Sequence, residues 1–393
     1  MEMWWHRLLF VLLVYAVSSE GFAQQPSIGY TTFRTDLPGG RHPNVRTMRA
    51  MVIQADGTKR REIASHLAEP ADTWTQFSAW SPDGKQAIVG CGWQHPENAK
   101  WEEEHKTFRM EAGRWHYDCY LLNLETGDLK NVCAVDRVSH YNGVSFTPDG
   151  TQLLMTSLLN GTSKPFVMNL DGSNKRDVSG GTDGFTYGFN ASPDGKRICY
   201  HEAYQVYVAD SDGTRKRKVE TGNPFNFSPV WSPNGQWIVF VSGEHYDCHP
   251  HIARADGTGI RKLADRNGYR GVTLFLDVFD FHQGSSDTPV WSATGDSIFY
   301  TAKVDDAIEL FQVSIDGAAK QLTHSAEGVS HYHPRPSPDG RYLLYGSKRE
   351  GVRQLFVRDL SLGTERQITH LEKGHAAMWP QWQPISEVFR TAD

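Results

Sequence analysis

A Ser-Pro-Asp-Gly tetrad, or a close variant of it, recurs six times along this chain of 393 residues. The glycine of each copy supplies the positive φ of a tight turn, and the proline, where present, sets the φ before it, so each copy predicts a β-hairpin. Successive tetrads are 40 to 66 residues apart, a period that fits units of four short strands. The six copies are 81–84, 147–150, 192–195, 232–235, 292–295 and 337–340.

The two ends of the chain complete the repeat. A truncated copy stands at 380–384, where the chain stops after one strand, and residues 28–66 contain an Asp-Gly turn without a preceding tetrad. Joining the two ends in one unit removes two exposed sheet edges. The sequence therefore predicts an all-β, seven-bladed β-propeller over residues 28–384, whose N- and C-terminal strands close one shared blade, and a C-terminal tail at 385–393.

Residues 1–23 have the three-part pattern of a secretory signal peptide: His6 and Arg7, an apolar run over 8–17, and small or polar residues up to Ala23. An apolar core of about ten residues is shorter than the roughly 20 that a membrane-spanning helix needs. We expect a periplasmic or secreted protein with no membrane span once the signal is removed. A formal charge of −6 offers no basic field for phosphates, which argues against nucleic acid as a partner.

Histidines gather at one predicted face of the propeller. The tetrad joins the first strand of a blade to the second, so the loop into the first strand and the turn between the second and third lie at the opposite face, here termed the histidine face. Two long insertions, 93–115 and 267–287, enlarge loops at the same face, and such loops commonly carry function. The histidines that reach this face are His140, His201, His245, His249, His251, His282, His331, His333 and His375.

The pair His331 and His333 is the most specific feature of this group. Alternate residues of a strand point the same way and can place two imidazoles on one ion. His249 and His251 have the same spacing. Completed by a third histidine or an oxygen ligand, such a pair suits Mn, Zn, Fe or Ni, and the sequence leaves the choice open.

The tetrad repeats resemble the TolB-type β-propeller over residues 70–384, a resemblance that is specific for fold. The last complete repeat, with His331-Tyr332-His333-Pro334 before its tetrad and Gly346–Gly351 after it, also resembles oligogalacturonate lyases. That resemblance implies a Mn-type divalent metal at the channel mouth, held by His331 and His333. A further histidine would complete the site, with His282 or His249 the nearest candidate. Gly328 stands where that family has a glutamine ligand, so the metal would be lost, replaced or differently ligated here.

The resemblance further implies metal-assisted β-elimination on the uronate sugars of an acidic oligosaccharide or polysaccharide. Removal of the C5 proton requires that a metal or an arginine neutralise the carboxylate and that a base stand beside it. We expect His249, His201 or His140 as the base and Tyr246 or Tyr332 as the proton donor to the leaving oxygen. Arg270 is the expected clamp, because guanidinium binds carboxylate bidentately.

Two other functions stay open at this point. A non-catalytic envelope propeller would bind a protein or a glycan and would have neither a metal nor a convergent base at the channel mouth. A hydrolase would need a pair of inward carboxylates, for which the histidine face offers only Asp247, Glu244 and Asp287.

Overall fold

The computed structural model describes residues 26–107, 109, 111, 113–133, 144–159, 162–270, 272–273, 278–279 and 287–384. The expected signal peptide (1–23), the C-terminal tail (385–393) and the candidate site residues His140 and His282 lie outside the described residues. Strands and turns dominate the rest, so the prediction of an all-β fold is confirmed. The described ranges also contain the short helices α1 (Arg41–Val45) and α2 (Pro96–His105) and the 3-10 helix η1 (Ser65–Ala68).

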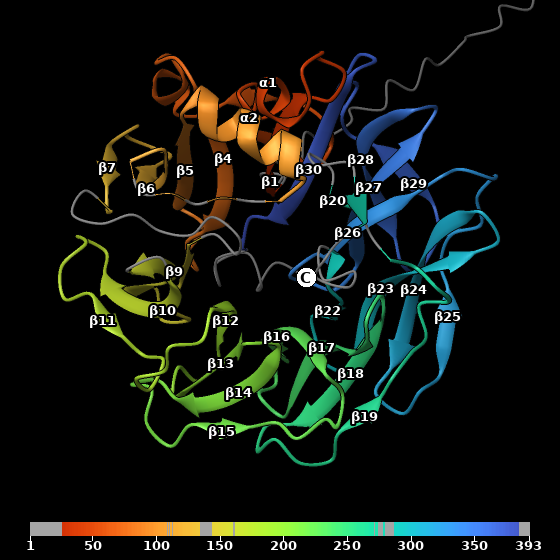
Figure 1. The fold of residues 1–393 in the computed structure, drawn as a ribbon. Helices are drawn as coiled ribbons and strands as arrows, with labels where there is room; N and C mark the ends of the chain where they lie inside the picture. The colour runs from red at the N-terminus through yellow and green to blue at the C-terminus, as the bar shows by residue number, and fades with distance from the viewer. Residues whose placement is uncertain are drawn as a thin grey trace, which may run out of the picture.

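Five four-stranded antiparallel sheets within the described residues follow one another in a ring (Figure 1). Each is built from consecutive strands, and its first strand lies nearest the centre of the ring. Sheet 1 contains β4 (Thr73–Trp80), β5 (Gln86–Gln94), β6 (Trp115–Asn123) and β7 (Leu129–Asn131). Sheet 2 contains β8 (Ser145–Phe146), β9 (Gln152–Leu159), β10 (Thr162–Asn169) and β11 (Arg176–Asp177). Sheet 3 contains β12 (Thr186–Ala191), β13 (Arg197–Glu202), β14 (Gln205–Asp210) and β15 (Arg217–Lys218).

The ring continues with the two sheets that flank the second insertion. Sheet 4 contains β16 (Phe225–Trp231), β17 (Trp237–Glu244), β18 (Asp247–Arg254) and β19 (Arg261–Lys262). Sheet 5 contains β22 (Val290–Trp291), β23 (Ser297–Val304), β24 (Ala307–Ser314) and β25 (Ala319–Gln321). Between them, the insertion forms a small two-stranded sheet from β20 (Val272–Thr273) and β21 (Val278–Phe279).

The two chain ends meet in an eight-stranded sheet with two halves. The first half contains β26 (His331–Pro336), β27 (Tyr342–Arg349), β28 (Val352–Asp359) and β29 (Glu365–Gln367). The second half contains β30 (His375–Trp382), β1 (Ser27–Arg34), β2 (Arg49–Gln54) and β3 (Arg61–Glu62). β1 pairs antiparallel with β30, as the truncated repeat predicts. A single parallel pair, Arg353 with Ala376, joins the two halves.

The tetrads form the turns that the sequence predicts. Each of the six lies between the first and second strands of a sheet or half-sheet. In the first copy, Ser81 Oγ donates to Asp83 Oδ1 (2.6 Å) and accepts from the backbone N–H of Gln86 (2.9 Å). Gly84 adopts a φ of +70°, which a glycine reaches without a steric penalty. Local turn chemistry therefore fixes these hairpins.

Buried side chains fill the spaces between neighbouring sheets. One cluster combines Val206 and Val208 of sheet 3 with Trp231 and Phe240 of sheet 4, and a second joins sheets 4 and 5. Close packing between sheets leaves little freedom for the strand ends. The loops at the histidine face therefore stand on a rigid scaffold.

Candidate functional site

The inner strands of the ring carry β-bulges near their histidine-face ends. A bulge turns a backbone N–H out of the ladder, and a buried N–H must then find another acceptor. In sheet 1, the N–H of Phe77 donates to Thr31 Oγ1 of the neighbouring half-sheet (3.1 Å). The register shifts that mark these bulges follow Phe77, Tyr187, Phe227 and Tyr332.

Two of the predicted site histidines accept such N–H groups. His201 Nδ1 accepts from the backbone N–H of Ser228 (3.0 Å), which belongs to the next sheet. His333 Nδ1 accepts from the backbone N–H of Trp379 on β30 (3.4 Å), and the two rings stack with centroids 6.0 Å apart. His201 therefore joins two neighbouring sheets and His333 joins the two halves of the eight-stranded sheet, a structural role that the sequence pattern did not reveal.

His249 makes the same kind of contact. Its Nδ1 accepts from the backbone N–H of Arg266 (3.2 Å), and its Nε2 lies 3.2 Å from Asp247 Oδ1. Burial, together with the nearby Lys262, lowers the pKa of His249, although Asp265 and Asp247 oppose this shift. The ring is therefore neutral at pH 7.

The three rings share one tautomer. A nitrogen that accepts a hydrogen bond carries no proton, so the proton of each neutral ring lies on Nε2. A protonated Nε2 donates hydrogen bonds and offers no lone pair to a metal or to a substrate proton. The roles of His249 and His201 as base and of His333 as metal ligand remain predictions, and this tautomer does not favour them.

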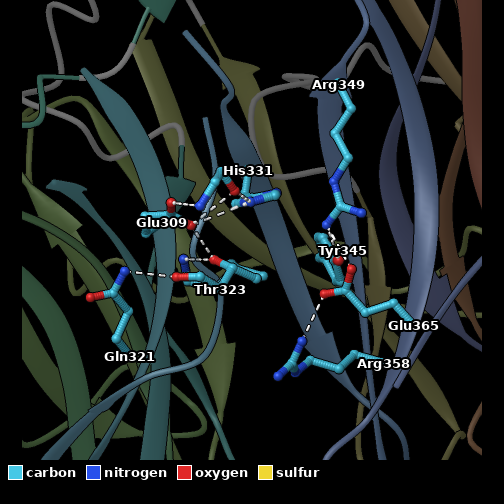
Figure 2. Close-up of polar contacts among 10 residues, drawn as sticks. Glu309, Gln321, Thr323, His331, Tyr345, Arg349, Arg358 and Glu365 are labelled. Atoms are coloured by element: carbon cyan, nitrogen blue, oxygen red, sulfur yellow. Dashed lines mark hydrogen bonds and ion pairs between the residues drawn. The ribbon is translucent and has the colours of Figure 1, made fainter. Parts of the chain in front are cut away.

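His331 belongs to a different, buried network (Figure 2). Its Nε2 lies 2.8 Å from Ser325 Oγ and 3.4 Å from Glu309 Oε2. Glu309 also accepts from the Thr323 hydroxyl and from the backbone N–H of Ser325 (2.6 Å). Burial raises the pKa of Glu309, but hydrogen bonds from His331, Thr323 and Ser325 outweigh it and lower the pKa to about 2. The carboxylate is therefore ionised at all but very acid pH.

The side chains of His331 and His333 therefore contact different parts of the structure, one in sheet 5 and the other on β30. The register of β26 shifts between Tyr332 and Arg335, and His333 adopts a φ of +50°. His331 faces Glu309 on β24, whereas His333 contacts Trp379 on β30. The regular strand alternation on which the paired-ligand prediction rests is interrupted by the bulge.

The described donors do not fit the metal that the resemblance implies. Among the residues that the structure describes, no group of three or more His, Cys, Asp or Glu side chains is arranged to hold a metal ion. His331 is engaged with Glu309, and His333 and His249 use Nδ1 to accept backbone N–H groups. We therefore derive no chemical step through a metal. His282, the third predicted ligand, lies outside the described residues.

Two half-buried arginines, Arg335 on β26 and Arg353 on β28, were not found by sequence reasoning. Burial lowers the pKa of both guanidinium groups; Asp287 opposes this for Arg335, and Tyr332 and Tyr269 oppose it for Arg353. Within the described ranges, neither guanidinium forms an ion pair with a carboxylate. An arginine on a strand is unremarkable in a sequence, and only the packing shows that these two are partly desolvated.

Buried polar contacts fix both ends of the 267–287 insertion. Arg266, which is 1% exposed, donates to the carbonyl of Thr301 (3.1 Å), to Thr301 Oγ1 (2.9 Å) and to the carbonyl of Asp287 (3.2 Å). The Asp287 carboxylate accepts from the Thr301 hydroxyl and from the backbone N–H of His333 (2.9 Å). The Arg266 guanidinium also lies 4.3 Å from the ring centroid of Tyr269, the tyrosine that influences Arg353.

Arg270 and Tyr246 are the two predicted site residues that the structure brings together. The Arg270 guanidinium lies 5.7 Å from the ring centroid of Tyr246, within the range of a cation–π contact. Tyr246 lies in the turn between β17 and β18 at the histidine face. Both residues therefore belong to the rim of that face.

A ring of four-stranded sheets, with tetrad turns at one end and arginine- and histidine-bearing loops at the other, defines a β-propeller with a candidate ligand site at its histidine face. The sequence matches the TolB beta propeller domain family over residues 110–328 and 201–389. The chain therefore belongs to this family, and the resemblance predicted from the tetrads is confirmed.

Individual proteins are similar over different lengths. An uncharacterized protein of Agrobacterium fabrum is 23% identical over 274 residues, which cover 68% of this chain and 82% of that protein. A TolB homolog of Chlorobium luteolum is 27% identical over 162 residues, and this match covers 41% of the chain and only 33% of the homolog. A solved oligogalacturonate lyase in complex with manganese has a TM-score of 0.56 at 14% identity, covering 88% of this chain and 86% of that structure. At this identity the last likeness shows the fold alone.

Proposed function

We propose that the chain is a seven-bladed propeller whose histidine face binds an acidic oligosaccharide through its carboxylates. Five four-stranded sheets and the two halves of the eight-stranded sheet support the blade count, and the pairing of β1 with β30 supports closure through a shared blade. The observation that carries the binding proposal is Arg353 at the histidine-face start of β28, a half-buried guanidinium that forms no ion pair with a carboxylate within the described residues.

The environment of Arg353 suits a ligand carboxylate. A cation held away from water without a counter-charge is unfavourable, and a bidentate carboxylate relieves that cost. The hydroxyl of Tyr332 is already used, since it donates to the carbonyl of Ala377 (2.9 Å). Arg335, on the inner strand β26 of the same half-sheet, is a second half-buried cation. Because an oligogalacturonate lyase shares the fold, we take a uronate as the source of the carboxylate.

Replacing Arg353 with methionine should weaken binding of trigalacturonate by about 10- to 100-fold, the usual value of a charge-assisted hydrogen bond. Arg353→Lys should lose less, because it keeps the charge but not the bidentate geometry. Arg215→Met is the matched control, since Arg215 lies on the opposite face with a side chain 81% exposed. Calorimetric titration measures all three, and equal affinities for Arg353→Met and Arg215→Met would exclude Arg353 from the site.

β-Elimination on the bound uronate is a second candidate function. The observation in its favour is again Arg353, because neutralising the carboxylate is the first requirement for an acidic C5 proton. The ultraviolet absorbance of unsaturated product tests it in the presence and absence of a chelator. A rise that survives the chelator supports neutralisation by arginine; a rise that the chelator abolishes supports a metal held partly by residues such as His282. Absence of a rise leaves binding without turnover.

Export is part of the same proposal. We infer that residues 1–23 are a signal peptide cleaved after Ala23 and that the mature protein is periplasmic or secreted, with an envelope protein as the alternative partner. N-terminal sequencing of the mature protein checks the cleavage position. The helices within the described ranges are all too short or too polar to cross a membrane.

A further inference from the structure

Two of the five cysteines lie on neighbouring strands at the outer side of sheet 1. Cys119 belongs to β6, and Cys133 lies just beyond the end of β7. The two strands pair through Tyr120 and Asn131, and the next backbone N–H, that of Val132, donates to the carbonyl of Cys119 (2.9 Å). Paired strands lie about 4.8 Å apart, so the backbones of the two cysteines are as close as a disulfide requires.

Both side chains point into the same hydrophobic cluster, which lies between sheets 1 and 2. Cys119 is fully buried, and Cys133 is 4% exposed. Asn131 fixes the bend that follows β7, because its Oδ1 accepts from the backbone N–H of Cys133 (2.8 Å) while its Nδ2 donates to Asp118 Oδ2 on β6 (3.4 Å). The position of the second thiol is therefore set by the end of the strand.

The other three thiols are satisfied in a different way. Each donates its proton to a backbone carbonyl, and the pairs are Cys91 with Leu67 (3.6 Å), Cys199 with Pro229 (3.4 Å) and Cys248 with Glu244 (3.2 Å). Such a contact suits a buried thiol that stays reduced. The thiols of Cys119 and Cys133 instead contact each other.

The two thiols of this pair differ in acidity. A hydrogen bond from Cys119 lowers the pKa of Cys133, although burial opposes this shift, and the nearby Lys175 ammonium lowers it further. Burial raises the pKa of Cys119, and its hydrogen bond with Cys133 adds to that rise. Since the thiolate is the nucleophile in disulfide exchange, Cys133 is the thiol that attacks.

We propose that Cys119 and Cys133 form a disulfide bond as the exported chain folds. The oxidant is a disulfide such as glutathione disulfide. It exchanges with the Cys119 thiol before the core closes, which gives a mixed disulfide and releases one thiol. The Cys133 thiolate then attacks the Cys119 sulfur, so that the new S–S bond forms and the second thiol of the oxidant leaves. Two thiols are thereby oxidised, one external disulfide is reduced, and both protons end on the released thiols.

The bond would join β6 to the end of β7 and close the loop of residues 119–133. A cross-link of this kind stabilises the fold mainly by restricting the unfolded chain. It requires oxidising surroundings, which the proposed export would provide. The inference concerns the scaffold, so it is independent of saccharide binding.

Refolding of the purified, fully reduced chain with reduced and oxidised glutathione tests the bond. After alkylation in denaturant, intact mass should show three modified thiols of the five, and peptide mapping should link residues 119 and 133. The melting temperature should exceed that of protein refolded without oxidant by roughly 4 °C. Cys133→Ala should have every remaining thiol alkylated and gain nothing from the oxidant.

The matched control is Cys199→Ala, which removes an equally buried thiol and should keep both the link and the gain in melting temperature. Alkylation of all five thiols in the refolded wild type, or a link to Cys91, Cys199 or Cys248, would overturn the proposal. An equal gain in Cys133→Ala would also contradict it. Because the assay contains no saccharide and starts from purified chain, its result and that of the proposed function are independent.

Discussion

Glu309→Ala should lower the free energy of unfolding by about 4 kcal/mol, as expected when one partner of a buried charged network is removed. Glu309 is 2% exposed and accepts from Thr323, from the Ser325 N–H and from His331. Alanine would leave these donors buried without an acceptor. Chemical denaturation followed by tryptophan fluorescence measures the loss. Glu327→Ala, at an exposed position of the same blade, is the control and should change little.

The same carboxylate makes stability depend on pH. The folded pKa of about 2 lies below the ordinary value of 4.5, so the stabilisation is fully present above pH 4.5 and is lost as the pH falls towards 2. Wild-type stability should therefore drop across this window, and Glu309→Gln should lack this part of the drop. Parallel pH profiles for the two proteins would show that the network does not hold Glu309 ionised.

Asp287→Ala should lower the free energy of unfolding by about 3 kcal/mol. The N–H of His333 and the hydroxyl of Thr301 would both lose their charged acceptor. The loss arises where the insertion rejoins sheet 5, so local opening should follow. Hydrogen exchange at the His333 amide should accelerate together with the fall in unfolding free energy.

Asp287→Asn separates this bonding role from charge. Its side-chain oxygen can still accept from His333, and the Thr301 hydroxyl can turn to accept from the amide, so most of the stability should return. An Asp287→Asn protein as unstable as Asp287→Ala would show that the charge of Asp287, felt by Arg335, matters more than the hydrogen bonds.

Much of the fold could be predicted because its determinants are local. Pro, Asp and Gly at fixed offsets specify each hairpin, and the truncated repeat at 380–384 shows which strand lacks partners. The pairing of β1 with β30 follows from that gap. No long-range information was needed for either conclusion.

The candidate site depended on contacts that a sequence does not display. The backbone N–H of His333 donates a hydrogen bond to Asp287, 46 residues away in sequence. His333 lies at a bulge where the strand alternation breaks. His201 likewise owes its role to Ser228 in the next sheet. Arg353 stands out only once its burial is known. Histidine spacing does not display the contacts that His201, His331 and His333 make with neighbouring sheets or half-sheets.

The most direct test of the central claim is a titration of the wild-type protein, in the presence of a chelator, with trigalacturonate and with its fully methyl-esterified form. We predict that the free acid binds, that its affinity falls as salt is added, and that the ester binds at least about tenfold more weakly, because the carboxylates are the recognised groups. Equal affinity for the two forms, or no binding of the free acid, would contradict the claim that this propeller recognises acidic saccharides through its arginines.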